Sequence, residues 1–160
     1  MSELIPSASH RAKVDQVERA LMNVPQVDCP VRHYFAPGMY AREITIPAGT
    51  TLIGAVHKTD NLVVLSAGRL RLATEAGPIE IAAPYTMLCK AGSKNAAVAL
   101  ETAIWTNFLP NPTNETDLDV LVEIFTESKA SELLGGTDNK QLAANRAAQQ
   151  LEASPCHLQR

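Results

Sequence analysis

The sequence predicts a mainly β fold, a barrel or sandwich of about eight strands with one helix before it and two after it. Between residues 40 and 109, short runs rich in strand-forming residues alternate with turn residues at close, regular spacing. On either side of this region, apolar residues follow helical spacing. The chain has 160 residues, 46% hydrophobic and 19% charged, which is enough to bury one core without disulfides.

A short helix is expected over residues 11–23, and Pro25 follows it as a stop signal. Its apolar face consists of Val14, Val17, Leu21 and Met22. The next stretch, QVDCPVRHYFAPGMY, contains two prolines and a Pro-Gly pair, so we expect an extended, turning segment rather than a regular element. That segment leads into the first core strand.

The expected strands read, in order, YAREITI, TLIGAVH, LVVLS, RLRLAT, PIEIAA, YTMLC, AAVAL and IWTNFL. In RLRLAT arginine alternates with leucine, and in PIEI isoleucine alternates with glutamate. Each of these two strands therefore has one solvent-exposed face and one face in the core. Glu75-Ala76-Gly77 is the expected hairpin turn between them.

Helical spacing returns after Pro112. Thr116 and Asp119 have the spacing of a capping box, and a helix of roughly fifteen residues is expected to begin there. Its apolar face consists of Leu118, Leu121, Val122 and Phe125. Gly135-Gly136 ends this helix, and the Ala-rich helix that follows needs a partner surface for stability.

These elements divide the chain into four expected parts. They are an N-terminal helical segment (1–28), a β-barrel (29–112), a helix packed on the barrel (113–136), and a C-terminal helix with a tail (137–160).

Charge and cysteine usage exclude several classes of partner. A net charge of −3 gives no global attraction to duplex nucleic acid or to an anionic membrane, and the apolar runs are too short to span a bilayer. Three widely spaced cysteines without CxxC spacing, and an N-terminus without the apolar core of a signal peptide, indicate the cytoplasm. No P-loop, dinucleotide fingerprint or nucleophile elbow is present.

The stretch GTTLIGAVHKTDNLVVLSAG resembles the first motif of the cupin superfamily, in which Gly is followed by His-x-His, then Glu, then Gly. Gly49, His57 and Gly68 keep their places. Ala55 stands at the position of the first histidine, and Asn61 at that of the glutamate. A first-row metal needs three or four converging ligands, and of the usual ones this motif keeps His57 alone.

In the second cupin motif, Lys90-Ala91-Gly92 replaces the Pro-x-Gly turn, and Asn95 takes the place of the third histidine. We expect no cofactor and no metal, with His57 as the one ligand if a metal binds. The segments CPVRHYFAPGMYAREITIPAGT, HKTD and ETDLD resemble more narrowly the small cupin-like proteins of phages and prophages. That resemblance implies a cupin double-stranded β-helix (jelly-roll) barrel that forms a homo-oligomer, and it implies no reaction.

His57 has two interpretations: a pocket residue that binds a ligand or a weakly held metal, or a satisfied core histidine. His33 is a distant second histidine that the sequence alone does not place. Asn61 and Asn95 offer amide donors and acceptors, which suit a neutral or polar ligand better than a metal.

Four further residues are candidates for ligand binding, each with a plainer alternative. Trp105 and Asn107 share one strand face, which suits a flat heterocycle or ordinary core packing. Arg42 shares a face with Tyr40, so it requires an anionic partner unless it is exposed. Lys94 lies near a strand end, where it either borders the mouth of the barrel as a ligand contact or is an ordinary solvent-exposed charge.

The leading hypothesis is a non-enzymatic, phage-type cupin that binds a small polar or anionic molecule. Family context extends it to sequestering a nucleotide-type host signal, an anti-defence role. The first alternative is an oligomeric structural protein of a virion or assembly, with the Ala-rich helix docking on a neighbour. The second is a metal-free isomerase that uses His57 as general base.

Overall fold

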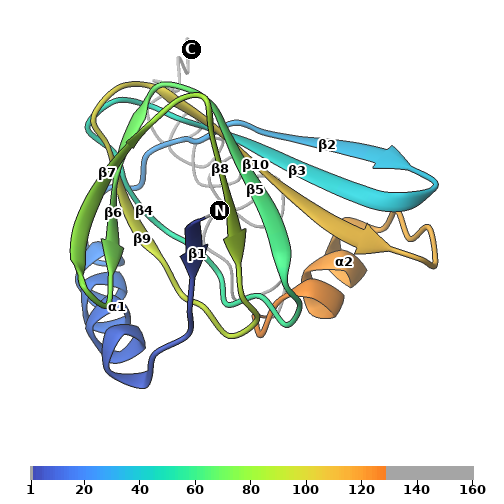
Figure 1. Cartoon of the computed structure of the whole chain (residues 1–160), viewed down its shortest axis with the longest axis horizontal. Coiled ribbons are helices and arrows are strands. Elements are labelled where there is room, and N and C mark those ends of the chain that lie inside the picture. The colour runs from blue at the N-terminus through green and yellow to red at the C-terminus, as the bar shows by residue number, and fades with distance from the viewer. Residues whose placement is uncertain (1, 129–160) are drawn as a thin grey trace, which may run out of the picture.

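Two β-sheets packed face to face form the body of the protein in the computed structural model, which describes residues 2–128 (Figure 1). The larger sheet has the strand order β1-β8-β5-β10-β3-β2. Its strands are β1 (Ser2–Leu4), β2 (Val31–Ala36), β3 (Gly38–Ile46), β5 (Asn61–Ala67), β8 (Tyr85–Cys89) and β10 (Ala103–Asn111). The smaller sheet has the order β4-β9-β6-β7 and contains β4 (Thr51–Ile53), β6 (Arg69–Thr74), β7 (Gly77–Ala82) and β9 (Ala96–Ala99).

The strand order is that of a jelly roll. From β3 to β10 the chain passes back and forth between the sheets, giving β8-β5-β10-β3 in one and β4-β9-β6-β7 in the other. The β6–β7 pair is the one hairpin among these eight strands. The mainly β, jelly-roll class expected from the sequence is therefore confirmed.

The core lies between the sheets and follows the alternation of each strand. Leu70 and Leu72 are fully buried while Arg69 and Arg71 face solvent, as the RLRLAT pattern predicts. Ile81 on β7 is also buried, but Ile79 next to the turn is 38% exposed, so that expectation was wrong. Other side chains of this core are Ile44, Ile46, Val63, Leu65, Met87 and Ala103.

The segment before the first core strand is more regular than expected. Residues 31–36 form strand β2, which pairs antiparallel with β3 at the edge of the larger sheet. Pro30 and Pro37 lie just outside this strand, where proline removes no ladder hydrogen bond. Residues 2–4, which the sequence pattern did not indicate, add strand β1 parallel to β8.

One expected strand is shorter than its pattern. TLIGAVH was interpreted as a strand over residues 51–57, but β4 ends at Ile53. His57 instead forms an isolated antiparallel bridge with Thr126. The placement of His57 on the strand face of Ile53 and Ala55 was therefore wrong, because a partner far along the chain pairs with it.

Helix α1 (Ala8–Leu21) begins and ends slightly earlier than expected, with Ser7 as its N-cap. Of its expected apolar face, Val14 is buried, whereas Val17 and Met22 are 43% and 55% exposed. Most of this helix therefore contacts the barrel through polar side chains rather than through an apolar stripe.

Helix α2 (Leu118–Phe125) buries its expected face through Leu121 and Phe125 against Tyr40 and Leu109. Its N-cap is Asp117, whose carboxylate accepts the backbone N–H groups of two following residues, and not Thr116. It has 8 residues, and the expectation of about fifteen was wrong because the chain turns extended to pair with residues 56–58.

The two described helices lie on opposite sides of the view, α1 beside the smaller sheet and α2 below the right-hand ends of β3 and β10 (Figure 1). Neither of them is long and apolar enough to cross a membrane. Gly135-Gly136 and the helix expected within residues 137–160 lie outside the described residues.

Gly68, in the tight turn between β5 and β6, adopts a positive φ of 78°. A Cβ at this position would lie 2.2 Å from the carbonyl oxygen of Thr102, closer than any real contact. Gly49 also has a positive φ, of 81°, but nothing lies within 4 Å of its Cβ position. An alanine at Gly49 would therefore introduce backbone strain alone, whereas an alanine at Gly68 would introduce strain and a steric clash.

We expect Gly68→Ala to lower the free energy of unfolding by several kcal/mol, on the order of 3 or more, since it combines the clash with strain. Gly49→Ala is the matched control and should cost about 1 kcal/mol from strain alone. Urea unfolding followed by circular dichroism measures both. Equal losses in the two variants would contradict the close approach at Gly68.

Candidate functional site

The register of the larger sheet brings three polar side chains into one row on the core-facing side. Arg42 on β3 lies directly opposite His33 on β2 and Asn107 on β10. Asn107 in turn lies opposite Val63, which is fully buried, so the row faces the interior. The alternation argument that put Arg42 on the face of Tyr40 therefore agrees with the structure.

Aromatic rings lie beside this row on the interior face, on the side where α2 packs. Tyr40 stacks against Phe35 and Phe125, with ring centroids 5.3 Å and 5.9 Å apart. The Tyr40 hydroxyl is hydrogen-bonded to Nδ1 of His33 at 2.8 Å. Burial raises the pKa of Tyr40 to about 12, against a smaller opposing effect of Arg42. Tyr40 is therefore a neutral hydroxyl that fixes the orientation of His33.

His57 is held by the residues that follow α2. The backbone N–H of Lys58 donates to the carbonyl of Phe125, and that of Glu127 donates to the carbonyl of Val56. Lys58 also donates through Nζ to the carbonyl of Glu123, near the C-terminus of α2, where a cation complements the free carbonyls. Its side chain is thus engaged at the helix end.

The imidazole of His57 is neutral near pH 7. Burial and, to a smaller extent, the nearby charge of Arg42 lower its pKa to about 4. Nδ1 of His57 and Oγ1 of Thr59 are both buried, and neither has a hydrogen-bond partner among residues 2–128. Buried polar atoms normally find partners, so these two are potential contacts for a bound molecule.

Arg42 is half-buried, and among the described residues it forms neither a hydrogen bond nor an ion pair. Burial lowers the pKa of its guanidinium, while the Tyr40 hydroxyl and the Cys29 thiol oppose that shift. A guanidinium remains charged at any ordinary pH. The site therefore contains a fixed positive charge on an interior face.

The polar side chains beside Arg42 are hydrogen-bonded to one another. Nε1 of Trp105 donates to Oδ1 of Asn107 at 3.1 Å, and Nδ2 of Asn107 donates to Oδ1 of Asn61 at 2.8 Å. Nδ2 of Asn61 makes a longer contact, 3.4 Å, with the carbonyl of Thr59. The three side chains thus form an internal hydrogen-bond chain beside Arg42, and Trp105 also packs against the main core.

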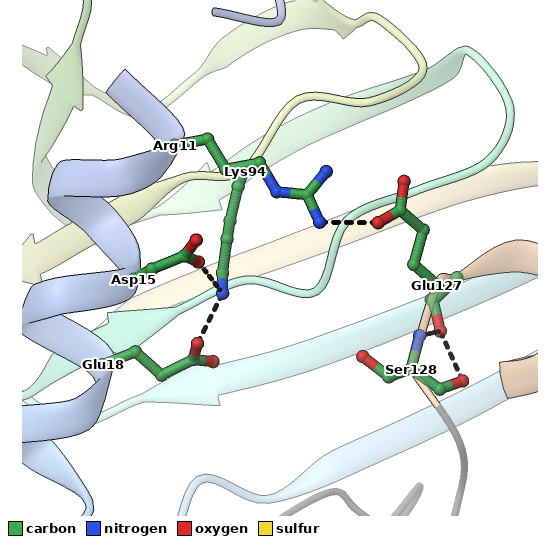
Figure 2. Close-up of polar contacts among 7 residues, drawn as sticks. Arg11, Asp15, Glu18, Lys94, Glu127 and Ser128 are labelled. Carbon is green, nitrogen blue, oxygen red and sulfur yellow. Dashed lines mark hydrogen bonds and ion pairs between the residues drawn. The ribbon is translucent and has the colours of Figure 1, made fainter. Parts of the chain in front are cut away.

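Two expected site residues belong to other parts of the barrel. Asn95 lies just before β9 of the smaller sheet, and its carbonyl accepts the N–H of Gly54. Lys94 is only 10% exposed and points at helix α1, where it forms ion pairs with Asp15 and Glu18 (Figure 2). Burial alone would lower the pKa of Lys94, but these two carboxylates outweigh it and raise the pKa.

Lys94 therefore anchors a helix, which its position near a strand end did not reveal. A second contact of α1 joins Arg11 to Glu127 at 2.6 Å, so the helix is tied to the segment that also holds His57 (Figure 2). We call these contacts, Lys94 with Asp15 and Glu18 and Arg11 with Glu127, the α1 clasp.

A shallow depression of about 300 Å³ lies elsewhere, at the turn between β2 and β3. Its lining residues are Phe35, Ala36, Pro37, Asn111, Asn114 and Thr116. Asn111 and Asn114 already hydrogen-bond to backbone groups, and none of the sequence-predicted site residues lines it. We therefore centre the candidate site on Arg42 and His57.

Within residues 2–128, no group of three or more His, Cys, Asp or Glu side chains is arranged to hold a metal ion. His33, which the sequence could not place, joins the row beside Arg42, yet its Nδ1 is engaged by Tyr40. The donors around Arg42 and His57 suit an oxygen-bearing anion better than a cation.

No family model and no curated protein matches the chain. Solved structures that match include a cupin-2 domain protein from Shewanella frigidimarina, with 12% identity, 60% of this chain and 92% of that chain covered, and a TM-score of 0.43. A cupin superfamily protein from Desulfitobacterium hafniense has 9% identity, coverages of 57% and 84%, and a TM-score of 0.46. KdgF from Halomonas sp. has 15% identity, coverages of 54% and 84%, and a TM-score of 0.45.

At these identities and TM-scores the likeness concerns the fold alone, and the jelly-roll assignment rests on strand order and register. Nothing about a ligand or a reaction transfers from these proteins.

The depressed pKa of His57 makes stability depend on pH. An unfolded histidine has a pKa near 6.5, so between pH 6.5 and about 4 the unfolded chain binds the proton that the folded protein excludes. This contribution is fully present above pH 6.5 and is lost as the pH falls to about 4, by roughly 3 kcal/mol. His57→Gln should flatten this loss relative to wild type, as measured by urea unfolding at several pH values. Identical pH profiles for the two proteins would contradict the burial of His57.

Proposed function

We propose that the protein binds a small anionic molecule, carrying a carboxylate or phosphate group, against Arg42 on the interior face of the larger sheet. The observation that carries this proposal is the half-buried Arg42 guanidinium, which among residues 2–128 has neither an ion-pair nor a hydrogen-bond partner. A desolvated cation without a partner destabilises a fold, and a bound oxyanion removes that cost. The planar guanidinium also matches an oxyanion in a bidentate arrangement.

Side chains near Arg42 provide further contacts for a bound anion. Nδ1 of His57 and Oγ1 of Thr59 are buried atoms that lack hydrogen-bond partners among the described residues, and both types of atom donate hydrogen bonds. The ring of Phe35, which is exposed and stacks on the buried Tyr40, offers an apolar surface nearby for the body of the ligand. A small molecule with one anionic end and one flat or apolar end fits this combination.

A nucleotide-type signal is one member of this class. Its phosphate would be the recognised group, because the amides of Asn61 and Asn107 are already hydrogen-bonded to each other and Asn107 is also bonded to Trp105. Base recognition by those amides would have to break existing hydrogen bonds. The proposal therefore commits to the anionic group, and leaves the nucleotide as one of the compounds to be tested.

Proton abstraction by His57, the isomerase alternative, is less favoured. A general base works best when its pKa lies near the working pH, and the pKa of His57 is about 4. Binding of an anion makes no such demand and uses the neutral imidazole as a hydrogen-bond donor.

The test is a thermal-shift panel of phosphate, succinate, adenosine monophosphate and glucose. At a concentration of 100 times Kd, an anion should stabilise wild type by about 2.7 kcal/mol, or about 5–10 °C in Tm. Arg42→Met should abolish the shift and raise the Tm of the ligand-free protein, because a buried unpaired charge is removed. Glucose, which is neutral, should shift neither protein.

Arg32→Met is the matched control, since Arg32 lies on β2 beside His33 but has a side chain 75% exposed on the opposite face. It should respond to anions like wild type. Arg42→Lys keeps the charge without the planar fork and should give a smaller shift. An Arg42→Met protein that responds like wild type, or a wild type that responds to no anion, would overturn the proposal.

A further inference from the structure

Two of the hydrogen-bonding side chains near Arg42 still lack a partner. The amide nitrogens of Asn61 and Asn107 already donate, at 3.4 Å and 2.8 Å. Nδ1 of His57 and Oγ1 of Thr59, in contrast, are buried and have no hydrogen-bond partner within residues 2–128. Together with the Arg42 guanidinium, these two atoms are the groups that a bound anion can engage without breaking an existing hydrogen bond.

His57 and Arg42 are near neighbours. Burial is the main cause of the low pKa of His57, and the charge of Arg42 adds to it, as a cation within a few ångströms does. A neutral imidazole carries its proton on either ring nitrogen, and an oxyanion facing Nδ1 favours the form with the proton there. In that form His57 donates a hydrogen bond to the anion.

Thr59 is connected to the same part of the barrel through two hydrogen bonds. Nδ2 of Asn61 donates to the Thr59 carbonyl, and Oδ1 of Asn61 accepts from Nδ2 of Asn107. Asn107 is the β10 residue directly opposite Arg42. The segment that carries His57 and Thr59 is thus joined to the strand beside Arg42, and it precedes β5 instead of belonging to β3.

The shape of an anion decides whether it can use all of these donors. A guanidinium donates two parallel hydrogen bonds to two oxygens of one anion. A carboxylate has only those two oxygens, and its acceptor positions lie in one plane with the guanidinium. A tetrahedral group, such as a phosphate monoester, has a third terminal oxygen outside this plane. Donors that come from a different segment, as His57 and Thr59 do, suit that third oxygen.

We propose that the anion bound at Arg42, the site on which this inference rests, is a tetrahedral oxyanion with three terminal oxygens, a phosphate monoester rather than a carboxylate. Arg42 binds two of the oxygens, and His57 and Thr59 bind the third. Each buried donor then has an acceptor, and the charge of Arg42 is neutralised. His57 and Thr59 thereby select the class of ligand, while Arg42 supplies the attraction common to all anions.

The experiment compares small anions that share a methyl group: acetate, methanesulfonate and methyl phosphate. Trp105 is the single tryptophan of the chain, and its Nε1 donates to Asn107 beside Arg42, so its fluorescence can follow titrations of the full chain. Acetate and methanesulfonate carry the same charge and differ in the third oxygen. Methanesulfonate should bind about tenfold more tightly, the gain from one hydrogen bond to a charged group. Methyl phosphate should bind at least as tightly as methanesulfonate, because it has the third oxygen and a greater negative charge.

Substitutions of Thr59 test the third-oxygen contact directly. Thr59→Val keeps the shape of the side chain and removes the donor, so it should weaken methanesulfonate binding about tenfold and leave acetate binding unchanged. Thr59→Ser keeps the hydroxyl and should retain the preference. Thr50→Val is the matched control, since Thr50 is also buried but lies just before β4 of the smaller sheet. It should bind all three anions like wild type, and circular dichroism checks that each variant is folded.

The outcomes separate this inference from the anion site itself. Equal binding of acetate and methanesulfonate by wild type, or an unchanged preference in Thr59→Val, would overturn the third-oxygen contact while Arg42 still binds anions. Arg42→Met should bind none of the three. If that variant binds them like wild type, or if wild type binds none of them, the anion site at Arg42 is wrong and the inference fails with it.

Discussion

Strand β10 pairs with β3 on one side and β5 on the other, and this double register decides which side chains meet on each face of the larger sheet. On the inner face it brings Asn107 beside Arg42, and on the outer face it brings Phe108 beside Ala41. Because side chains alternate along a strand, a slip of one residue would exchange the two faces. The polar site on the inner face and the exposed position of Phe108 on the outer face are thus two consequences of a single alignment.

An interior cation has a cost that the rest of the barrel must offset. The core between the sheets is mainly apolar, with Val63, Leu65 and Leu70 fully buried. Replacing an unpaired buried charge with an apolar side chain of similar size commonly stabilises a protein. The cost of the Arg42 charge to folding is therefore the physical reason for proposing that it binds an anion.

Period-two alternation was enough to predict a mainly β barrel or sandwich, the burial of Leu70 and Leu72, and the shared face of Arg42 and Tyr40, whereas the jelly-roll order was implied by the family resemblance. It also put Trp105 and Asn107 on one face, although it gave no sign that they hydrogen-bond to each other. Such local patterns record which side of a strand is buried. They carry no record of the distant segment that will lie against it.

The failures follow from that limit. His57 pairs with Thr126, and the expected strand over residues 51–57 could not reveal a partner so far along the chain. Lys94 was expected at the rim of the barrel as a ligand-binding charge. It instead forms ion pairs with two carboxylates of α1 and attaches that helix to the barrel. Strand β2 was missed because prolines flank it, yet it brings His33 next to Arg42.

The α1 clasp gives the N-terminal helix a different kind of attachment from the rest of the fold. Only Val14 of this helix is buried, so charged and polar contacts supply most of its docking. Charged contacts weaken as salt screens them, whereas apolar contacts between the sheets do not. We therefore expect the docking of helix α1 to depend on ionic strength more than the pairing of β10 with its neighbours does. Because Glu127 belongs to the segment that holds His57, salt that weakens the Arg11–Glu127 pair also weakens one of the ties of that segment.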